Sequence, residues 1–339
     1  MRRTLHLHFA KFDISTDRLE LDGLLERLYA DNDLTGDALT ADAAFTPVAG
    51  RLHLDVVDED ALGAEMPARA VFAETNLCAG RCYYLDGTFT AIVRGDYPLR
   101  VDYDIESATL RARLSPRFLD DPQLVIGRVL RPFLQSFLLP FFRLKSVHAA
   151  AVARDGRGTL LVGPGGSGKT TTAIELAHHG FTLLSDDGPL LTKTASGTVV
   201  LSSLDYVHAT DGTLALFPNL RGHVVGVKDH REKYAIARRA FGDDDRWREP
   251  VAVDTYVELR RSRISRPAIT PMPRREVLAD LVRDSMIVFR HPALRQPRFT
   301  RHAAWTLDCL GALVAGLRAF RVEFADEHLH ELPALVASL

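Results

Sequence analysis

Residues 163–170 read Gly163-Pro164-Gly165-Gly166-Ser167-Gly168-Lys169-Thr170. The strand-like residues 159–162 precede this run, and the helix-favouring residues 172–177 follow it. Glycines let consecutive backbone N–H groups turn inward around a phosphate, while the following helix points its positive end at the same anion. This arrangement is typical of a Walker A loop. A chance glycine-rich turn is the alternative, and eight positions in register argue against it.

The loop also carries side chains suited to a nucleoside triphosphate and its metal. Lys169 is placed to reach the terminal phosphates, and Thr170 to offer its hydroxyl to Mg²⁺. The neighbouring Thr171 completes the set of residues expected to bind the cofactor. We therefore predict that ATP and Mg²⁺ bind here.

Two adjacent carboxylates follow one helix and one strand later. Gly180 is expected to end the helix, and the apolar residues 181–184 are typical of a buried strand that leads into Asp186 and Asp187. Successive residues at a strand end point to opposite sides, so one aspartate can hold Mg²⁺ while the other faces an acceptor as a base. The alternative is a solvated Asp-Asp-Gly turn.

Composition limits the class of protein. The chain has 339 residues, 46% of them hydrophobic, and a formal net charge of -2, which suits an ordinary globular protein with room for two domains. Basic residues are spread along the chain, so we expect no nucleic-acid partner. Three cysteines, Cys78, Cys82 and Cys309, can form neither a disulfide framework nor a four-sulfur zinc site, and a reducing cytoplasm is the expected location.

No membrane partner is expected either. The most apolar segment, residues 129–144, is short and interrupted by Arg131, Pro132, Pro140 and Arg143, so it is interpreted as a buried or interfacial helix. The first eight residues alternate as in a strand and lack the apolar core of a signal peptide.

The pattern along the chain predicts a domain boundary near residue 145. Residues 1–145 are expected to form an α+β amino-terminal domain for substrate recognition or regulation, and residues 146–339 the catalytic domain. The expected strands are 51–57, 91–93, 146–153, 198–201, 251–259 and 320–324; the expected helices are 19–29, 274–285, 301–317 and a closing helix from residue 327. The poorly patterned residues 241–248 are expected to be a loop.

A family resemblance follows from three segments. Residues 148–150, His-Ala-Ala, the loop 163–170, and residues 183–187, Leu-Leu-Ser-Asp-Asp, resemble the carboxy-terminal catalytic domain of HPr kinase/phosphorylase and its relatives. The likeness is concentrated in residues 146–195, and the amino-terminal half does not visibly share it. It implies an α/β P-loop kinase domain of the HPr kinase/phosphoenolpyruvate carboxykinase type, with a mixed sheet.

The resemblance also implies roles for individual residues. Asp186 would be the base that takes the proton of the acceptor hydroxyl, Asp187 would help Thr170 to hold Mg²⁺, and His148 would lie close to the transferring phosphoryl group. With Lys169, these side chains would supply the positioning and charge neutralisation that phosphoryl transfer requires. For His148, a buried structural histidine is the alternative.

The chain departs from the family pattern at two places. Thr171 stands where HPr kinases typically have an acidic residue, and residues 219–222, Asn-Leu-Arg-Gly, stand nearest to their Glu-x-Arg-Gly signature. The loss of that carboxylate favours a forward kinase over the reverse, phosphate-driven reaction. Arg221, Lys228 and Lys233 are candidates to reach a phosphate, and ordinary surface roles are the alternative.

The acceptor is predicted from the resemblance alone. Our first interpretation is a serine-type kinase acting on a peptide or protein, such as the precursor of a ribosomally made (lasso) peptide. A kinase for a small molecule such as free serine is the alternative within the enzyme class, and a non-catalytic nucleotide-binding switch or assembly factor is the alternative from another class. The family often forms oligomers, so a homo-oligomer is compatible with the resemblance.

Overall fold

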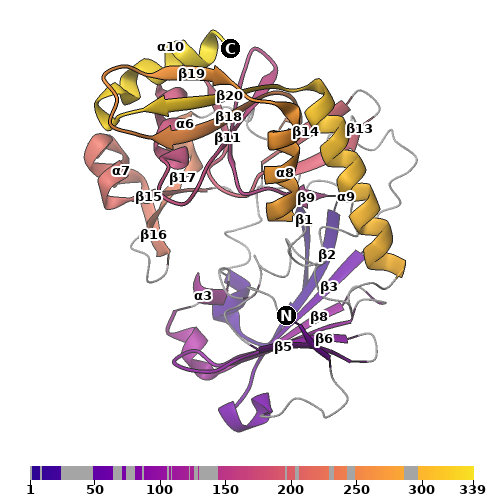
Figure 1. Ribbon diagram of the computed structural model, residues 1–339. Coiled ribbons are helices and arrows are strands. Elements are labelled where there is room, and N and C mark those ends of the chain that lie inside the picture. The colour runs from indigo at the N-terminus through magenta and orange to yellow at the C-terminus, as the bar shows by residue number, and fades with distance from the viewer. Residues whose placement is uncertain are drawn as a thin grey trace. The chain divides into compact units, whose positions relative to one another are not determined.

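The computed structural model divides the chain into two compact units. The first unit comprises residues 1–143 and 286–303, and the second comprises residues 144–285 and 304–339 (Figure 1). The structure describes residues 2–7, 10–23, 49–63, 71–73, 81–85, 88–104, 107, 109–121, 123–125, 129, 144–194, 197–202, 206–228, 233–242, 249–285 and 297–339.

An eight-stranded sheet forms the first unit. Its order is β1-β2-β3-β8-β7-β6-β5-β4, with parallel pairs only on the two sides of β3. Its strands are β1 (Arg2–Leu7), β2 (Ala10–Thr16), β3 (Ala49–Val56), β4 (Val71–Ala73), β5 (Arg81–Leu85), β6 (Thr88–Val93), β7 (Leu99–Asp104) and β8 (Thr109–Leu114). Short helices η1 (Glu59–Leu62), η3 (Pro116–Leu119) and α3 (Gln123–Val125) accompany them.

The second unit is built on a nine-stranded mixed sheet, so the expected mixed α/β class is confirmed. Strand β11 lies between β10, antiparallel to it, and β18, parallel to it, and β18 also pairs in parallel with β20. The strands are β9 (Lys145–Ser146), β10 (Ala150–Arg154), β11 (Arg157–Val162), β12 (Thr182–Ser185), β13 (Leu190–Thr194), β14 (Gly197–Leu201), β18 (Val251–Arg261), β19 (Ala268–Pro271) and β20 (Arg318–Phe324).

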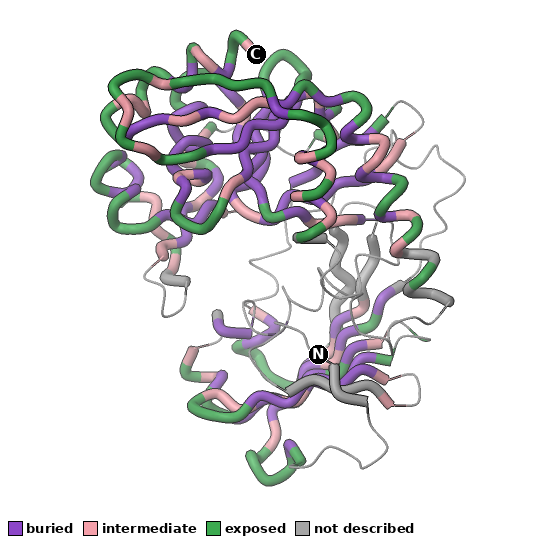
Figure 2. The backbone as a smooth tube through the Cα atoms, viewed as in Figure 1, coloured by how far each residue is buried: buried purple, intermediate pink, exposed green. Residues whose placement is uncertain are grey.

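Alternating side chains on the central strands supply two hydrophobic cores. Leu160, Val162 and Tyr256 face one core, which α8 (Arg274–Ser285) and α9 (Pro297–Gly316) cover. Leu161 and Val257 face the opposite core, which α6 (Lys169–His178), α7 (Asp211–Leu216) and α10 (Leu332–Ala337) cover. The buried positions follow these central strands in Figure 2. Burial on both faces explains the nearly continuous apolar runs of β10 and β11.

A smaller antiparallel sheet accompanies the helices of the second core. Its strands are β15 (Tyr206–Thr210), β16 (Val224–Lys228) and β17 (Lys233–Ala237), in the order β15-β17-β16. Short helices η6 (Pro218–His223), η8 (Arg238–Phe241) and η12 (Asp326–Glu331) follow β15, β17 and β20 along the chain. We did not predict this sheet from the sequence, because its strands are short and their polar residues interrupt the alternation.

One expected strand is in fact two separate strands. Residues 146–153 were expected to form a single strand, but β9 pairs with β13, while β10 pairs with β11 and β12. The chain breaks between them because Ala149 N–H bonds to Val147 C=O at 2.9 Å, in a tight turn centred on His148. Strand pairing to different partners, which a local pattern does not reveal, separates the two halves.

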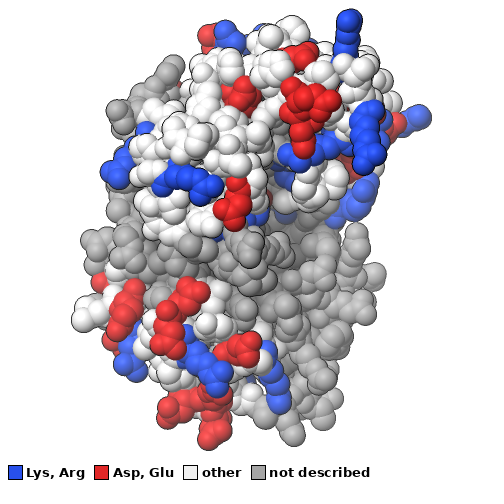
Figure 3. All heavy atoms as spheres, turned by 90° about the vertical axis from the view of Figure 1, so that its left-hand side faces the viewer, with Lys and Arg blue, Asp and Glu red and all other residues white. Residues whose placement is uncertain are grey.

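Three expectations lie largely outside the described residues. The helix expected at 19–29 is described only to residue 23, the segment 129–144 only at its two ends, and the loop 241–248 only at its first two residues. In the described part of the chain, no helix is long and apolar enough to span a bilayer. Acidic and basic side chains stand interspersed on the face of the second unit drawn in Figure 3.

Candidate active site

Left-handed glycines shape the loop between β11 and α6. Gly163, Gly166 and Gly168 have φ of 144°, 81° and 92°, values that side-chain-bearing residues rarely adopt. At Gly163, a Cβ atom would lie 2.7 Å from both the Leu259 carbonyl oxygen and the Ser167 hydroxyl. The loop therefore requires glycine at position 163. The N-terminus of α6, which follows the loop, is suited to an anion.

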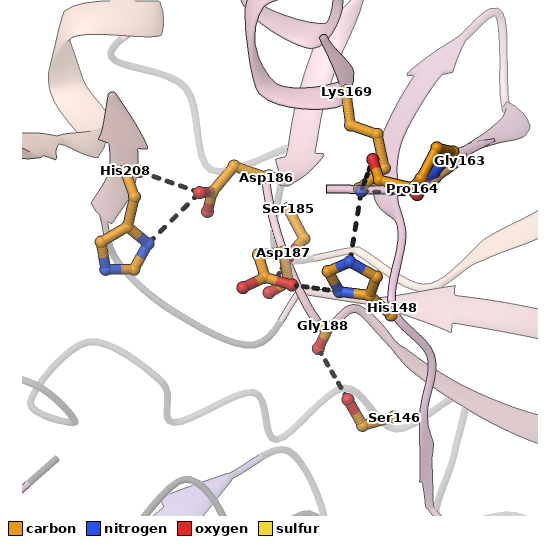
Figure 4. A network of polar contacts seen from close by, with 10 residues as sticks. All are labelled: Ser146, His148, Gly163, Pro164, Lys169, Ser185, Asp186, Asp187, Gly188 and His208. Atoms are coloured by element: carbon orange, nitrogen blue, oxygen red, sulfur yellow. Dashed lines mark hydrogen bonds and ion pairs between the residues drawn. The ribbon is translucent and has the colours of Figure 1, made fainter. Parts of the chain in front are cut away.

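Lys169 is the first residue of α6 and is almost fully buried, at 8% exposure. Its ammonium donates to the carbonyl oxygens of Gly163 at 2.8 Å and Pro164 at 3.3 Å. It also lies 3.2 Å from Nε2 of His148, as Figure 4 shows. These two carbonyl oxygens and the His148 ring thus hold the Lys169 ammonium at the loop. A bound phosphate could replace them as its hydrogen-bond partner.

His148 joins Lys169 to a carboxylate. Its Nδ1 lies 3.2 Å from Oδ1 of Asp187, on the side of the ring opposite to Lys169 (Figure 4). An ammonium only donates, so Nε2 accepts from Lys169, and the remaining ring proton on Nδ1 donates to Asp187. The contacts assign a neutral imidazole that lies between the loop lysine and the carboxylate.

Backbone contacts hold the Asp187 turn against the His148 turn. Gly188 N–H donates to Ala149 C=O at 3.2 Å, and Ser146 Oγ donates to Gly188 C=O at 3.4 Å. Ser185 Oγ bonds to the Asp187 carbonyl at 3.2 Å. The Asp187 side chain remains 27% exposed. Asp187 is therefore both positioned and reachable.

Asp186 points the other way, to β15 (Figure 4). Its Oδ2 accepts from the His208 backbone N–H at 2.9 Å and lies 3.2 Å from His208 Nδ1, with both residues at most 3% exposed. Burial opposes its charge, but the charge and hydrogen bonds of His208 hold the pKa of Asp186 below its ordinary value. The Asp186 carboxylate is therefore enclosed and already bonded, whereas the Asp187 carboxylate is partly exposed.

The Thr171 hydroxyl is buried 3.0 Å from the hydroxyl of Thr213, so this side chain contacts α7. A role of Thr171 in binding the cofactor stays a prediction. Thr170, the second residue of α6, is half-buried. The glycine cradle and the Thr170 hydroxyl suit a magnesium triphosphate, because Mg²⁺ prefers oxygen ligands and usually takes few from protein. Among the residues described, no three His, Cys, Asp or Glu side chains form a metal cage by themselves.

The three remaining candidates lie in η6 and the small sheet. Arg221 is exposed within η6, Lys228 lies in β16, and Lys233 lies opposite Thr210 in the pairing of β17 with β15. Their reach toward a phosphate stays a prediction.

Sequence reasoning missed Arg261, at the end of β18. A Cβ atom on Gly168 would lie 3.1 Å from its Nε and 3.2 Å from its Nη2, so its guanidinium covers the start of α6. Asp326 holds it, with Oδ1 3.2 Å from Nε. A cation at a helix N-terminus is unfavourable without an anion nearby. No local signal distinguished this arginine from the many others in the chain.

Arg238 was missed as well. It is buried in η8 and donates to the carbonyl oxygens of Leu183 and Leu184 in β12, the latter at 3.0 Å. It also donates to Ser202 Oγ at 3.2 Å. The arginine therefore supports the strand that carries both aspartates. A buried arginine cannot be told from an exposed one in the sequence.

Comparison with known proteins finds partial similarities to this chain. No family model matches the chain. A curated protein of Fusobacterium nucleatum, provisionally named an HPr kinase/phosphorylase, is 34% identical over 105 residues, which are 31% of this chain and 15% of that protein. The solved Hpr(Ser) kinase/phosphatase of Coxiella burnetii is 14% identical, with a TM-score of 0.27, covering 57% of this chain and 93% of that one. The chain thus spans a small part of its curated relative, and over that part it is similar to a protein named for HPr kinase/phosphorylase, in agreement with the resemblance seen in its sequence.

Proposed function

We propose that this protein is an ATP-dependent phosphotransferase that transfers the γ-phosphoryl group to a serine-type hydroxyl. The observation that carries the proposal is the continuous line of contacts from Lys169 through His148 to Asp187, at the mouth of the glycine loop. If the loop only bound a nucleotide, no partly exposed carboxylate such as Asp187 would need to be held beside it. The similarity to an HPr kinase/phosphorylase supports the same class of reaction.

The loop residues would bind and neutralise the triphosphate. Backbone N–H groups of residues 163–170 face the β-phosphate in such loops, and Lys169 would exchange the carbonyls of Gly163 and Pro164 for β- and γ-phosphate oxygens. Thr170 would hold Mg²⁺, which would neutralise charge on the same oxygens. Once Lys169 has moved to the phosphates, Nε2 of His148 would lie beside the γ-phosphoryl group.

Asp187 is the carboxylate that this arrangement favours as the base, in place of Asp186. The acceptor oxygen forms a bond to the γ-phosphorus while the bond from that phosphorus to the β,γ-bridging oxygen breaks, and ADP leaves. The hydroxyl proton passes to the Asp187 carboxylate. The Nδ1–H of His148 holds that carboxylate in place, and the buried Asp186–His208 contact anchors the turn behind it.

The finer aspects of the function follow the family resemblance. The acceptor is a peptide or protein in the first interpretation, with residues 1–145 as the part that recognises or regulates it. A small molecule is the second acceptor class. A homo-oligomer in the cytoplasm is the proposed setting.

Exchange of each aspartate for asparagine tests the assignment. Asp187→Asn should lower phosphoryl transfer about 10²- to 10⁴-fold, the usual contribution of general base catalysis, and leave ATP affinity within a few-fold of wild type. Asp186→Asn should instead lower stability, because it leaves His208 buried beside a neutral partner. Transfer is measured with γ-labelled ATP and ATP affinity by calorimetry, with thermal melting as the control for folding.

The opposite result would return the base to Asp186. If Asp186→Asn abolishes transfer in a folded protein while Asp187→Asn keeps wild-type turnover, the reassignment is wrong. ATP binding without transfer to any acceptor by wild-type protein would favour the non-catalytic switch.

A further inference from the structure

A cavity of about 270 Å³ opens beside the glycine loop, within the second unit. Val162, at the end of β11, and Tyr256, in β18, line it opposite Leu281 in α8. His148, Gly163 and Pro164 also line it, and each of them contacts the Lys169 ammonium. The cavity therefore borders residues that hold the Lys169 ammonium, and Figure 4 shows their contacts with it.

The charged groups of the cavity are already paired. Glu258 is buried and accepts from Arg260 at 2.9 Å and Arg321 at 2.6 Å, while Asp280 pairs with Arg283, which lines the same cavity. The backbone N–H groups and the helix end that suit a phosphate lie in the glycine loop. The loop is therefore the nucleotide site of the proposed function, and the cavity is left for the acceptor.

Asp280 and Arg283 form an exchangeable ion pair in the cavity wall. They are one helical turn apart in α8, with Nη2 2.5 Å from Oδ1, and their side chains are 34% and 64% exposed. A zwitterion offers the matching charges, because its carboxylate can bond to the guanidinium and its ammonium to the aspartate. A residue inside a peptide chain carries neither charge on its backbone.

We propose that this cavity is the acceptor subsite and that it takes a small free hydroxy amino acid. The inference rests on the proposed phosphotransferase function and selects the small-molecule acceptor over the peptide. The volume is below the range of about 300–1,000 Å³ that accommodates drug-sized ligands, which fits one amino acid. The ammonium and carboxylate of the amino acid would bind Asp280 and Arg283, and its side-chain hydroxyl would then point to His148 and the γ-phosphate. Its oxygen takes the phosphoryl group, its proton goes to Asp187, and ADP leaves.

The test compares free and blocked acceptors with the full chain. L-serine, L-threonine and L-homoserine, N-acetyl-serine amide, and a serine-containing peptide are each incubated with ATP and Mg²⁺. ADP release and phosphorus NMR of the product report transfer. We expect phosphorylation of at least one free amino acid and none of the blocked compound or the peptide.

Variants in α8 test the subsite itself. Arg283→Ala and Asp280→Asn should each raise the KM for the amino acid about 10- to 100-fold, as expected when one charge-assisted hydrogen bond is lost, with the KM for ATP unchanged. Arg275→Ala is the matched control, an exposed arginine in the same helix outside the cavity lining. Thermal melting checks that the variants fold.

The outcomes separate this inference from the proposed function. Asp187-dependent labelling of the peptide alone would overturn the amino acid subsite and leave the phosphotransferase standing. An unchanged KM in both α8 variants would also overturn it. ATP binding without transfer to any compound would count against both proposals.

Discussion

Two neighbouring aspartates near the glycine loop have different surroundings. Asp186 and Asp187 are neighbours in the chain, yet one is buried against His208 and the other faces His148. Both aspartates follow the end of β12, in the bend that leads to Gly188, and this bend turns the two side chains to different neighbours. The sequence predicted that the two aspartates would divide two roles, but not which one would face the loop.

Arg261 is the residue whose contribution is easiest to measure. Its guanidinium lies against Gly168 at the start of α6 and pairs with Asp326, and a triphosphate bound at this helix end would be a second anion within its reach. We expect Arg261→Ala to weaken ATP binding by about 1.5–3 kcal/mol, the size of a hydrogen bond to a charged group. Calorimetric titration with ATP and Mg²⁺ measures it.

The control removes the partner that holds the guanidinium. Asp326→Asn frees Arg261 from its acidic partner, so ATP affinity should stay unchanged or rise. Equal affinities for wild type and Arg261→Ala would show that the arginine serves only its contact with Asp326.

At the scale of elements, the active site depends on how β12 is held. Its end is anchored to β15 through Asp186 and His208, and to η8 through Arg238. The break between β9 and β10 then sets His148 against the turn that follows β12. These contacts join segments far apart in sequence, so local periodicity predicted the strand but not its supports.

The anchor makes the stability of the fold depend on pH in a defined direction. Since the pKa of Asp186 is lower in the folded than in the unfolded protein, its ionisation stabilises the fold at pH values above its unfolded pKa, about 3.9. That contribution is lost as the pH falls from there through the folded pKa. The difference in unfolding free energy between wild type and Asp186→Asn should therefore shrink as the pH falls below about 4.

Urea unfolding followed by tryptophan fluorescence measures this difference at each pH. The comparison with Asp186→Asn cancels the titration of the many other carboxylates, which both proteins share. A difference that stays constant down to pH 3 would show that the carboxylate gains nothing from His208.

For the whole molecule, the discontinuous second unit means that ligand binding at one loop stabilises distant parts of the sequence together. Residues 144–285 and 304–339 share the two cores on either side of the central strands. The loop leads directly into α6, which packs in one of these cores. Binding there should therefore be visible in the unfolding of the unit.

We expect ATP with Mg²⁺ to raise the stability of the protein by about 2.7 kcal/mol when free ATP is one hundred times its Kd. Lys169→Ala should lose most of this gain, because the ammonium no longer meets the terminal phosphates. Differential scanning fluorimetry measures the shift in melting temperature, with AMP, which lacks the β- and γ-phosphates, as the control ligand. An equal shift with AMP would place the binding energy outside the loop.

The residues of the loop, the end of α6 near Gly180 and the buried strand 182–185 could be predicted from the sequence, because each depends on a local pattern. Helix 274–285 was predicted at its observed limits. Short apolar runs and glycine positions report backbone conformation directly.

Tertiary structure alone decided which groups meet at the loop. It turned Asp187 toward His148 and Asp186 away, packed Thr171 against α7, and brought Arg261 from β18 to the first turn of α6. These outcomes depend on strand pairing and packing between residues distant in the chain. Such contacts form only when the whole unit is assembled, so the sequence determined the glycine loop and the fold determined which side chains surround it.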